Sequence, residues 1–152
     1  IDELTIIFTK TLADTEGRVI NQMIDNYVNK NLHKAVAFKS MGQLHYISAL
    51  KYIDVVAGNS SSGVIETPSF KLPTLNIGIR EKGRIMADNV ICVDQNIDAI
   101  KAGFNKALSS SFQASLTNMV NPYEKADTAL NIATVLSEYN LPTSTAKEFY
   151  DL

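Results

Sequence analysis

The stretch Gly58-Asn59-Ser60-Ser61-Ser62-Gly63 combines the residue types that could hold a phosphate group. Its small residues would let a ligand approach the main chain closely, and its three serine hydroxyls add hydrogen-bond donors. Free N–H groups at the start of a following helix would favour an anion. A diphosphate is therefore the natural occupant. The alternative is a flexible Gly/Ser turn that binds no ligand.

Three charged residues downstream could act on the same ligand. Glu66 follows the serine stretch by about one helical turn, where its carboxylate could accept hydrogen bonds from a ribose diol. Its alternative role is a helix-end charge in solvent. Arg80 and Arg84 lie in a basic loop, and a guanidinium suits phosphate because it can donate two parallel hydrogen bonds. The alternative for this loop is a solvated charge cluster that is paired through Glu81.

Motifs for catalysis are scarce in the chain. The serine stretch reads neither Gly-x-x-x-x-Gly-Lys-Ser/Thr nor Gly-x-Ser-x-Gly, so it predicts neither a P-loop nor a hydrolase nucleophile. No His, Cys or carboxylate cluster has metal-ligand spacing, and no carboxylate pair indicates a general acid and base. We therefore expect binding chemistry without a metal or a cofactor, and we assign no catalytic residue.

The elements that must position these residues alternate between strands and helices. Apolar, β-branched runs at 5–9, 35–38, 54–57, 74–77 and 90–93 predict strands, and the segments 19–28 and 40–52 have helical spacing. This alternation predicts an α/β fold, a Rossmann-like parallel sheet of five or six strands with helices on both faces and ligands at the carboxyl ends of its strands. Further helices are predicted over 97–108, 112–119 and 129–139, with a short tail helix over 143–152.

Composition indicates one ordinary globular domain over residues 1–152. The chain has 14 Lys plus Arg and 16 Asp plus Glu, a net charge of −2, which gives no reason to expect nucleic acid or an anionic membrane as a partner. No apolar run approaches the ~20 residues of a membrane span, so we expect a cytoplasmic protein. Cys92 lies in an apolar run and is expected to be buried. The chain lacks an initiator Met, and we expect it to be a piece of a longer protein.

The stretch from Gly58 to Phe70 resembles the signature of UDP-N-acetylglucosamine 2-epimerases, and the likeness continues through Lys71–Gly78. Further matching positions are Arg80, Gly83-Arg84, Asp88-Asn89-Val90 and Asn121-Pro122-Tyr123, although Glu124 replaces the usual Gly. The resemblance implies two Rossmann-like domains of the GT-B type with the active site between them. This chain would be the second domain, its partner would be its own N-terminal domain, and the full-length protein is expected to be a homo-oligomer.

The serine stretch is closer to the hydrolysing branch of that family, whose members release UDP and N-acetylmannosamine for sialic-acid-type sugars. The resemblance implies a UDP-sugar substrate, with the main acid and base carboxylates in the N-terminal domain. It also implies that Ser60 and Ser61 contact phosphate, that Ser62 and Gly63 complete the loop, and that Glu66 contacts the ribose. Arg80 would contact or organise the nucleotide, and the uracil would lie near the main chain from Phe38 to Gly42.

The segment after the first strand departs from the family pattern. Many relatives carry an active-site His there, whereas this chain reads Thr9-Lys10-Thr11-Leu12-Ala13-Asp14. Lys10 could stand near the phosphates instead, or it could be a solvated lysine. Two other functions remain open: the donor-nucleotide domain of a GT-B glycosyltransferase, and a 2-epimerase specific for GDP-linked sugars. A receiver-like module is disfavoured because Ile7-Phe8-Thr9 ends without an acidic cluster.

Overall fold

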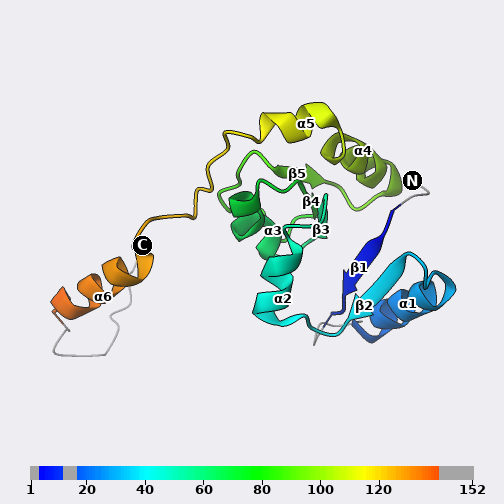
Figure 1. The fold of residues 1–152 in the computed structure, drawn as a ribbon, viewed down its shortest axis with the longest axis horizontal. Coiled ribbons are helices and arrows are strands. Elements are labelled where there is room, and N and C mark those ends of the chain that lie inside the picture. The colour runs from blue at the N-terminus through cyan, green and yellow to red at the C-terminus, as the bar shows by residue number, and fades with distance from the viewer. Residues whose placement is uncertain (1–3, 12–16, 141–152) are drawn as a thin grey trace, which may run out of the picture.

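The computed structural model describes residues 4–11 and 17–140, and it has the predicted α/β fold (Figure 1). The predicted tail helix over 143–152 lies outside the described residues. In chain order the elements are β1 (Ile6–Thr9), α1 (Gly17–Lys30), β2 (Ala35–Phe38), α2 (Gly42–Ala49), β3 (Val56–Gly58), α3 (Ser62–Ile65), the 3-10 helix η1 (Thr67–Phe70), β4 (Thr74–Ile77), β5 (Val90–Val93), α4 (Ile97–Ala107), α5 (Ser110–Ser115) and α6 (Thr128–Glu138).

The strands form two parallel sheets, which differs from the single sheet predicted. β1 pairs with β2 in the register Ile6↔Ala35, and β4 lies between β3 and β5 in the second sheet. Within the described residues no ladder joins β1 to β3. Ile7 of β1 and Val56 of β3 instead line one cavity, so the facing strand edges are separated by a hollow with apolar walls.

Helices cover both faces of the three-stranded sheet, as predicted. A Cβ added to Gly63 of α3 would lie 2.7 Å from Thr74 Cγ2, and one added to Gly103 of α4 would lie 2.3 Å from Leu75 Cδ1. Successive residues of a strand point to opposite faces. Because Thr74 and Leu75 are adjacent in β4, α3 and α4 pack on opposite faces, and glycine at both positions permits the close approach.

The main core lies between the three-stranded sheet and α4. Leu75, Ile91 and Ala107 are buried there, with Phe104 and Phe112 packed against them. The prediction that Cys92 is buried is wrong, because the alternation of side chains along β5 puts Ile91 into the core and leaves Cys92 exposed.

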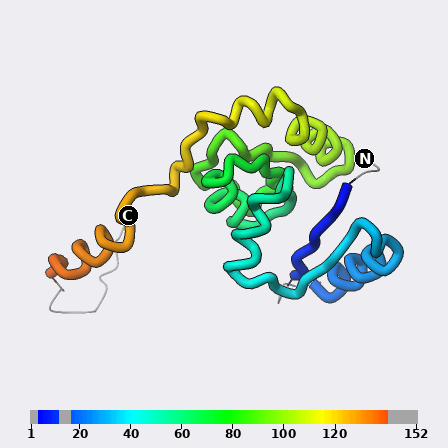
Figure 2. The backbone as a smooth tube through the Cα atoms, viewed as in Figure 1, coloured from blue at the N-terminus to red at the C-terminus, as the bar shows by residue number. Residues whose placement is uncertain are grey.

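The last described helix, α6, stands away from the sheets. Figure 2 shows the chain leaving α5 and running through a long connection before α6 begins. The apolar residues of the predicted stripe are exposed on α6, with Leu130 at 65% and Leu136 at 72%. No described helix is both long enough and apolar enough to span a bilayer.

Candidate functional site

The serine stretch lies where it was predicted, at the carboxyl end of a strand. β3 ends at Gly58, and α3 begins at Ser62 after Asn59-Ser60-Ser61. The turn is closed by hydrogen bonds from Gly63 N–H to the Ser60 carbonyl at 3.0 Å and from Val64 N–H to the Ser61 carbonyl at 3.0 Å. A tight turn between strand and helix thus holds the serine hydroxyls in a fixed order.

The expectation of free main-chain donors at the helix start is only partly met. Besides the two bonds that close the turn, Ser62 N–H donates to Ser60 Oγ at 3.4 Å. The N–H groups of Ser62, Gly63 and Val64, at the start of α3, are therefore satisfied within the turn. The serine hydroxyls are further donors that this loop can offer to an anion.

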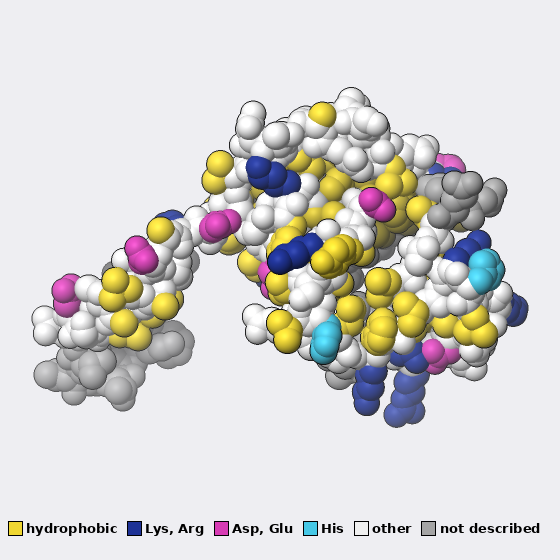
Figure 3. Space-filling model, in the orientation of Figure 1, with side chains coloured by type: hydrophobic (Ala, Val, Ile, Leu, Met, Phe, Trp, Pro, Cys, Tyr) yellow, Lys and Arg dark blue, Asp and Glu magenta, His cyan; other side chains and the backbone are white. Residues whose placement is uncertain are grey.

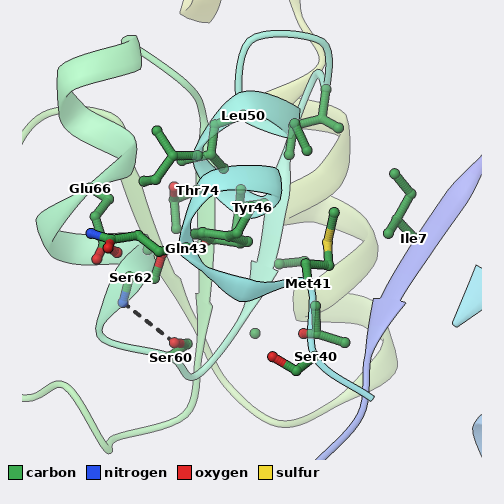
Figure 4. Close-up of a pocket in the computed structure, with 18 of the residues that line it drawn as sticks. Ile7, Ser40, Met41, Gln43, Tyr46, Leu50, Ser60, Ser62, Glu66 and Thr74 are labelled. Carbon is green, nitrogen blue, oxygen red and sulfur yellow. Dashed lines mark hydrogen bonds between the residues drawn. The ribbon is translucent and has the colours of Figure 1, made fainter. Parts of the chain in front are cut away.

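A cavity of about 650 Å³ lies beside the loop, between the two sheets. Its walls come from β1, the segment 39–43, α2, β3 and α3 (Figure 4). Figure 3 shows apolar side chains gathered on the surface between α2 and β1, where this cavity lies. Of the predicted site residues, those that line the cavity are Lys10, Gly42, Ser60, Ser62, Gly63 and Glu66.

Glu66 lies at the junction between α3 and η1, with its side chain in the cavity wall. Its Oε2 atom is buried and has no hydrogen-bond partner among the described residues. An ionised carboxylate accepts hydrogen bonds and cannot donate them. Glu66 therefore offers an unused acceptor. Its buried oxygen does not fit the alternative role of a helix-end charge in solvent.

A buried polar network holds α3 against the sheet. Thr67 donates its hydroxyl to the Gly63 carbonyl at 2.8 Å, and Thr67 Oγ1 and Thr74 Oγ1 are 2.7 Å apart. Asn89 donates to Thr67 Oγ1 at 3.0 Å and to the Leu72 carbonyl at 2.7 Å. Because buried polar groups are costly when unpaired, this network fixes the start of η1 directly after Glu66.

Asn121 secures the same junction from the other side. It is 6% exposed, and its side-chain amide donates to the Ile65 carbonyl at 3.0 Å and to Ser69 Oγ at 2.8 Å. Ser69 in turn donates to Glu124 Oε2 at 3.0 Å. The Asn-Pro-Tyr stretch therefore contacts the segment that carries Glu66, which its place in the sequence did not indicate.

Four predicted site residues do not line the cavity. Asn59 and Ser61 lie in the turn, and Arg80 is exposed on the loop after β4. Arg84 Nε lies 2.7 Å from Glu81 Oε2, although its N–H is not aligned for a hydrogen bond. The alternative of a charge cluster paired through Glu81 therefore describes Arg84. Within that cluster Arg84 is half exposed, whereas Glu81 is buried, with 2% of its surface exposed.

Lys10, which follows β1, and Gly42, which begins α2, both line the cavity. Lys10 Nζ is 2.5 Å from Asp25 Oδ1, so its charge is already paired within the chain. Gly42 begins α2 with a φ of 65°, a conformation that favours glycine, which gives this residue a structural role. Of the segment from Phe38 to Gly42, where the resemblance places the base, residues 39–42 line the cavity and Phe38 does not.

Tyr46 is a cavity residue that carried no signal in the sequence. Its hydroxyl forms a short hydrogen bond with Ser62 Oγ, which joins α2 to α3 across the cavity wall. Burial raises the pKa of Tyr46 above its ordinary 10.0, and the nearby Glu66 raises it further, while the bond to Ser62 acts in the opposite direction. Only the folded chain brings residues 46 and 62 together.

The arrangement supplies hydroxyl donors, a buried carboxylate acceptor and apolar walls in one hollow. Within 4–11 and 17–140, no group of three or more His, Cys, Asp or Glu could hold a metal ion. Such a hollow suits a ligand with a flat or apolar part, hydroxyl groups and an anionic part.

Sequence comparisons decide the family. Residues 1–137 match the family described as UDP-N-acetylglucosamine 2-epimerase. The chain belongs to this family. The predicted family membership is therefore confirmed.

Curated relatives in the family share substantial identity. A Campylobacter jejuni protein named GDP/UDP-N,N'-diacetylbacillosamine 2-epimerase (hydrolyzing) is 42% identical over 97% of this chain, and 38% of that protein is covered. A Legionella pneumophila UDP-N,N'-diacetylbacillosamine 2-epimerase (hydrolyzing) is 40% identical over 70% of the chain and 28% of its own length. The Escherichia coli polysialic acid biosynthesis protein P7 is 32% identical over 96% of the chain and 37% of its own length. The chain thus spans well under half of these relatives.

Proposed function

We propose that this chain is the nucleotide-binding half of a hydrolysing 2-epimerase that acts on a UDP-linked sugar. The observation that carries the proposal is the buried Glu66 Oε2, which has no hydrogen-bond partner among the described residues and belongs to a cavity that Ser60 and Ser62 also line. In this arrangement the carboxylate would accept from the ribose diol, and the serine hydroxyls would donate to the diphosphate.

The energetics favour such a ligand. A buried acceptor without a partner costs about 1–3 kcal/mol, and a ribose hydroxyl would remove that cost on binding. The base would occupy the apolar part of the cavity beside the segment 39–42, whose main-chain groups would bind its edge. Arg80, which is exposed near the start of the loop after β4, would add its charge to the nucleotide from outside the cavity.

The reaction of the intact enzyme would be elimination followed by hydration. The bond from C1 to the UDP oxygen breaks, C2 loses its proton, and a C1–C2 double bond forms. Water then adds its hydroxyl to C1, and a proton returns to C2 on the opposite face. The products are UDP and the free 2-epimer. The residues of this chain would bind and orient the leaving UDP, and the acid and base groups would belong to the N-terminal domain.

The identity of the sugar is proposed from the sequence resemblance and from the names of the relatives. UDP-N-acetylglucosamine, which would give N-acetylmannosamine, is the substrate that the sequence resemblance implies. The two relatives at 42% and 40% identity carry the name of N,N'-diacetylbacillosamine, which favours a UDP-linked diacetamido sugar as the alternative. The name of the Campylobacter protein includes GDP, so a GDP-linked sugar is tested beside them.

The rest of the protein enters as part of the same proposal. Residues 1–152 would form the second domain of a GT-B-type enzyme, with its own N-terminal domain as partner, in a cytoplasmic homo-oligomer. Half of a binding cleft supplies half of the contacts, so the chain alone would bind UDP weakly and turn over no substrate.

The test is incubation of the full-length protein with each of the three sugar nucleotides. Release of UDP together with a free 2-epimer, in the absence of any acceptor, is the expected result. Transfer of the sugar to an added acceptor, with no free epimer, would identify a glycosyltransferase and overturn the proposal. Turnover by residues 1–152 alone would show that the catalytic groups have been misplaced.

A further inference from the structure

Tyr46 and Ser62 connect two walls of the cavity at a single point. Tyr46 belongs to α2 and Ser62 is the first residue of α3, and the hydroxyl of Tyr46 is hydrogen-bonded to Ser62 Oγ. Both side chains line the cavity that also contains Glu66 (Figure 4). The bond thus lies at the place where the proposed function puts the nucleotide.

The direction of this hydrogen bond follows from the acidity of the two groups. Either hydroxyl could donate in this bond. A phenol is a stronger acid than an aliphatic alcohol, so we assign Tyr46 as the donor and Ser62 Oγ as the acceptor. Burial keeps the pKa of Tyr46 above its ordinary value, opposed by the bond to Ser62 and aided by the charge of Glu66, so the phenol retains its proton at neutral pH. Ser62 then keeps the hydrogen of its own hydroxyl.

The other polar groups of Ser62 are also engaged. Its N–H donates to Ser60 Oγ at 3.4 Å, and its carbonyl accepts from Glu66 N–H at 3.0 Å. With Oγ accepting from Tyr46, the hydroxyl hydrogen is the remaining donor of Ser62. That hydrogen belongs to a residue held by three bonds, in a loop whose N–H groups at Ser62, Gly63 and Val64 are used within the turn.

We propose that Tyr46 is a positioning residue, which orients the Ser62 hydroxyl as a donor to a phosphate oxygen of a bound nucleoside diphosphate. This inference rests on the proposed function, since it requires a nucleotide in the cavity. A donor that is already oriented loses less conformational freedom on binding, and it therefore contributes more affinity than a freely rotating hydroxyl. The phenol ring alone would not have this effect, because the hydrogen bond to Ser62 is made by the hydroxyl.

The experiment compares UDP with uridine on the full-length protein. Calorimetric titration measures UDP affinity, and ligand-detected NMR measures the weaker uridine affinity, for the wild type, Tyr46→Phe, Ser62→Ala and the double variant. Tyr46→Phe should weaken UDP binding by about two- to tenfold and leave uridine binding unchanged. The double variant should bind UDP like Ser62→Ala, because the two changes remove one shared interaction.

Three results would overturn the inference. Wild-type UDP affinity in Tyr46→Phe would show that the hydroxyl does not act on the phosphates. An equal loss of UDP and uridine affinity would place Tyr46 at the nucleoside. Should Tyr46→Phe fail to fold in melting curves, an unchanged UDP affinity in Ser62→Ala would be decisive against it. A wild-type protein that binds neither ligand would instead reject the proposed function itself.

Discussion

Asn121 donates its side-chain amide to the main-chain carbonyl of Ile65, the residue directly before Glu66, at 3.0 Å. The two residues are 56 positions apart in the chain. A segment that follows α5 therefore fixes the junction between α3 and η1, and with it the position of the Glu66 carboxylate.

Asn121→Ala should lower both stability and UDP affinity. The change leaves the Ile65 carbonyl and the Ser69 hydroxyl without their partner, which should reduce the free energy of unfolding by about 1–3 kcal/mol. Denaturant unfolding and UDP titration of the full-length protein measure the two effects. The matched control is Asn118→Ala at an exposed position nearby, which should change neither quantity. A stable Asn121→Ala protein with wild-type affinity would contradict this role.

Arg84→Ala should destabilise the protein without depending on any ligand. Glu81 is 2% exposed, and removing Arg84 leaves its carboxylate without the cation that lies 2.7 Å away. Because Arg84 itself is half exposed, we expect a loss of about 1–3 kcal/mol in the free energy of unfolding, below that of a fully buried pair. Lys82→Ala, at an exposed position of the same loop, is the control. Equal unfolding midpoints for the two variants would show that the pair contributes nothing.

Arg80→Ala should behave in the opposite way. Arg80 is exposed, so its removal should change the free energy of unfolding by no more than about 0.5 kcal/mol. If Arg80 contacts the nucleotide, UDP affinity should fall, and its dependence on salt concentration should become shallower. Titration of UDP at low and high salt measures both. An unchanged salt dependence would remove Arg80 from the site.

Much of the fold follows from local sequence patterns. The strands β2, β4 and β5 have the predicted bounds because short apolar runs there are flanked by polar or turn-forming residues. β3 begins later than predicted, at Val56, and the separation of β1 from β3 was not foreseen. Which strand edges pair depends on contacts between distant segments, and an apolar run carries no information about its neighbour.

The site residues also divide into those that a local sequence pattern located and those that depend on distant contacts. The glycines and serines that follow a predicted strand located the turn, because these residue types act through their own main chain. Glu66 could be located because it follows them by about one helical turn. Tyr46 and Asn121 could not be located, because each acts on a residue far away in the chain. The pairing of Arg84 with Glu81 was open from the sequence, since spacing allowed it but did not decide between a partner and a ligand.

The raised pKa of Tyr46 predicts a loss of stability in strongly alkaline solution. A phenol whose pKa is higher in the folded than in the unfolded protein contributes stability below the unfolded pKa, near 10.0, and this contribution is lost as pH rises through the folded pKa. The wild type should therefore lose more stability above pH 10 than Tyr46→Phe does. Denaturant unfolding of both proteins at several pH values measures the difference, in which the shared titration of lysines cancels. Parallel pH profiles would contradict the prediction.

The proposed nucleotide site is tested most directly by UDP titration of the wild type, Glu66→Gln and Ser61→Ala in the full-length protein. Glu66→Gln keeps the shape of the side chain but removes its charge, and a hydrogen bond to a charged group contributes roughly 1.5–3 kcal/mol. We expect UDP affinity to fall about tenfold to a hundredfold in Glu66→Gln. Ser61 lies outside the cavity lining, so Ser61→Ala should bind UDP nearly as the wild type does. Wild-type affinity in a folded Glu66→Gln protein would contradict the ribose contact and the nucleotide site built around it.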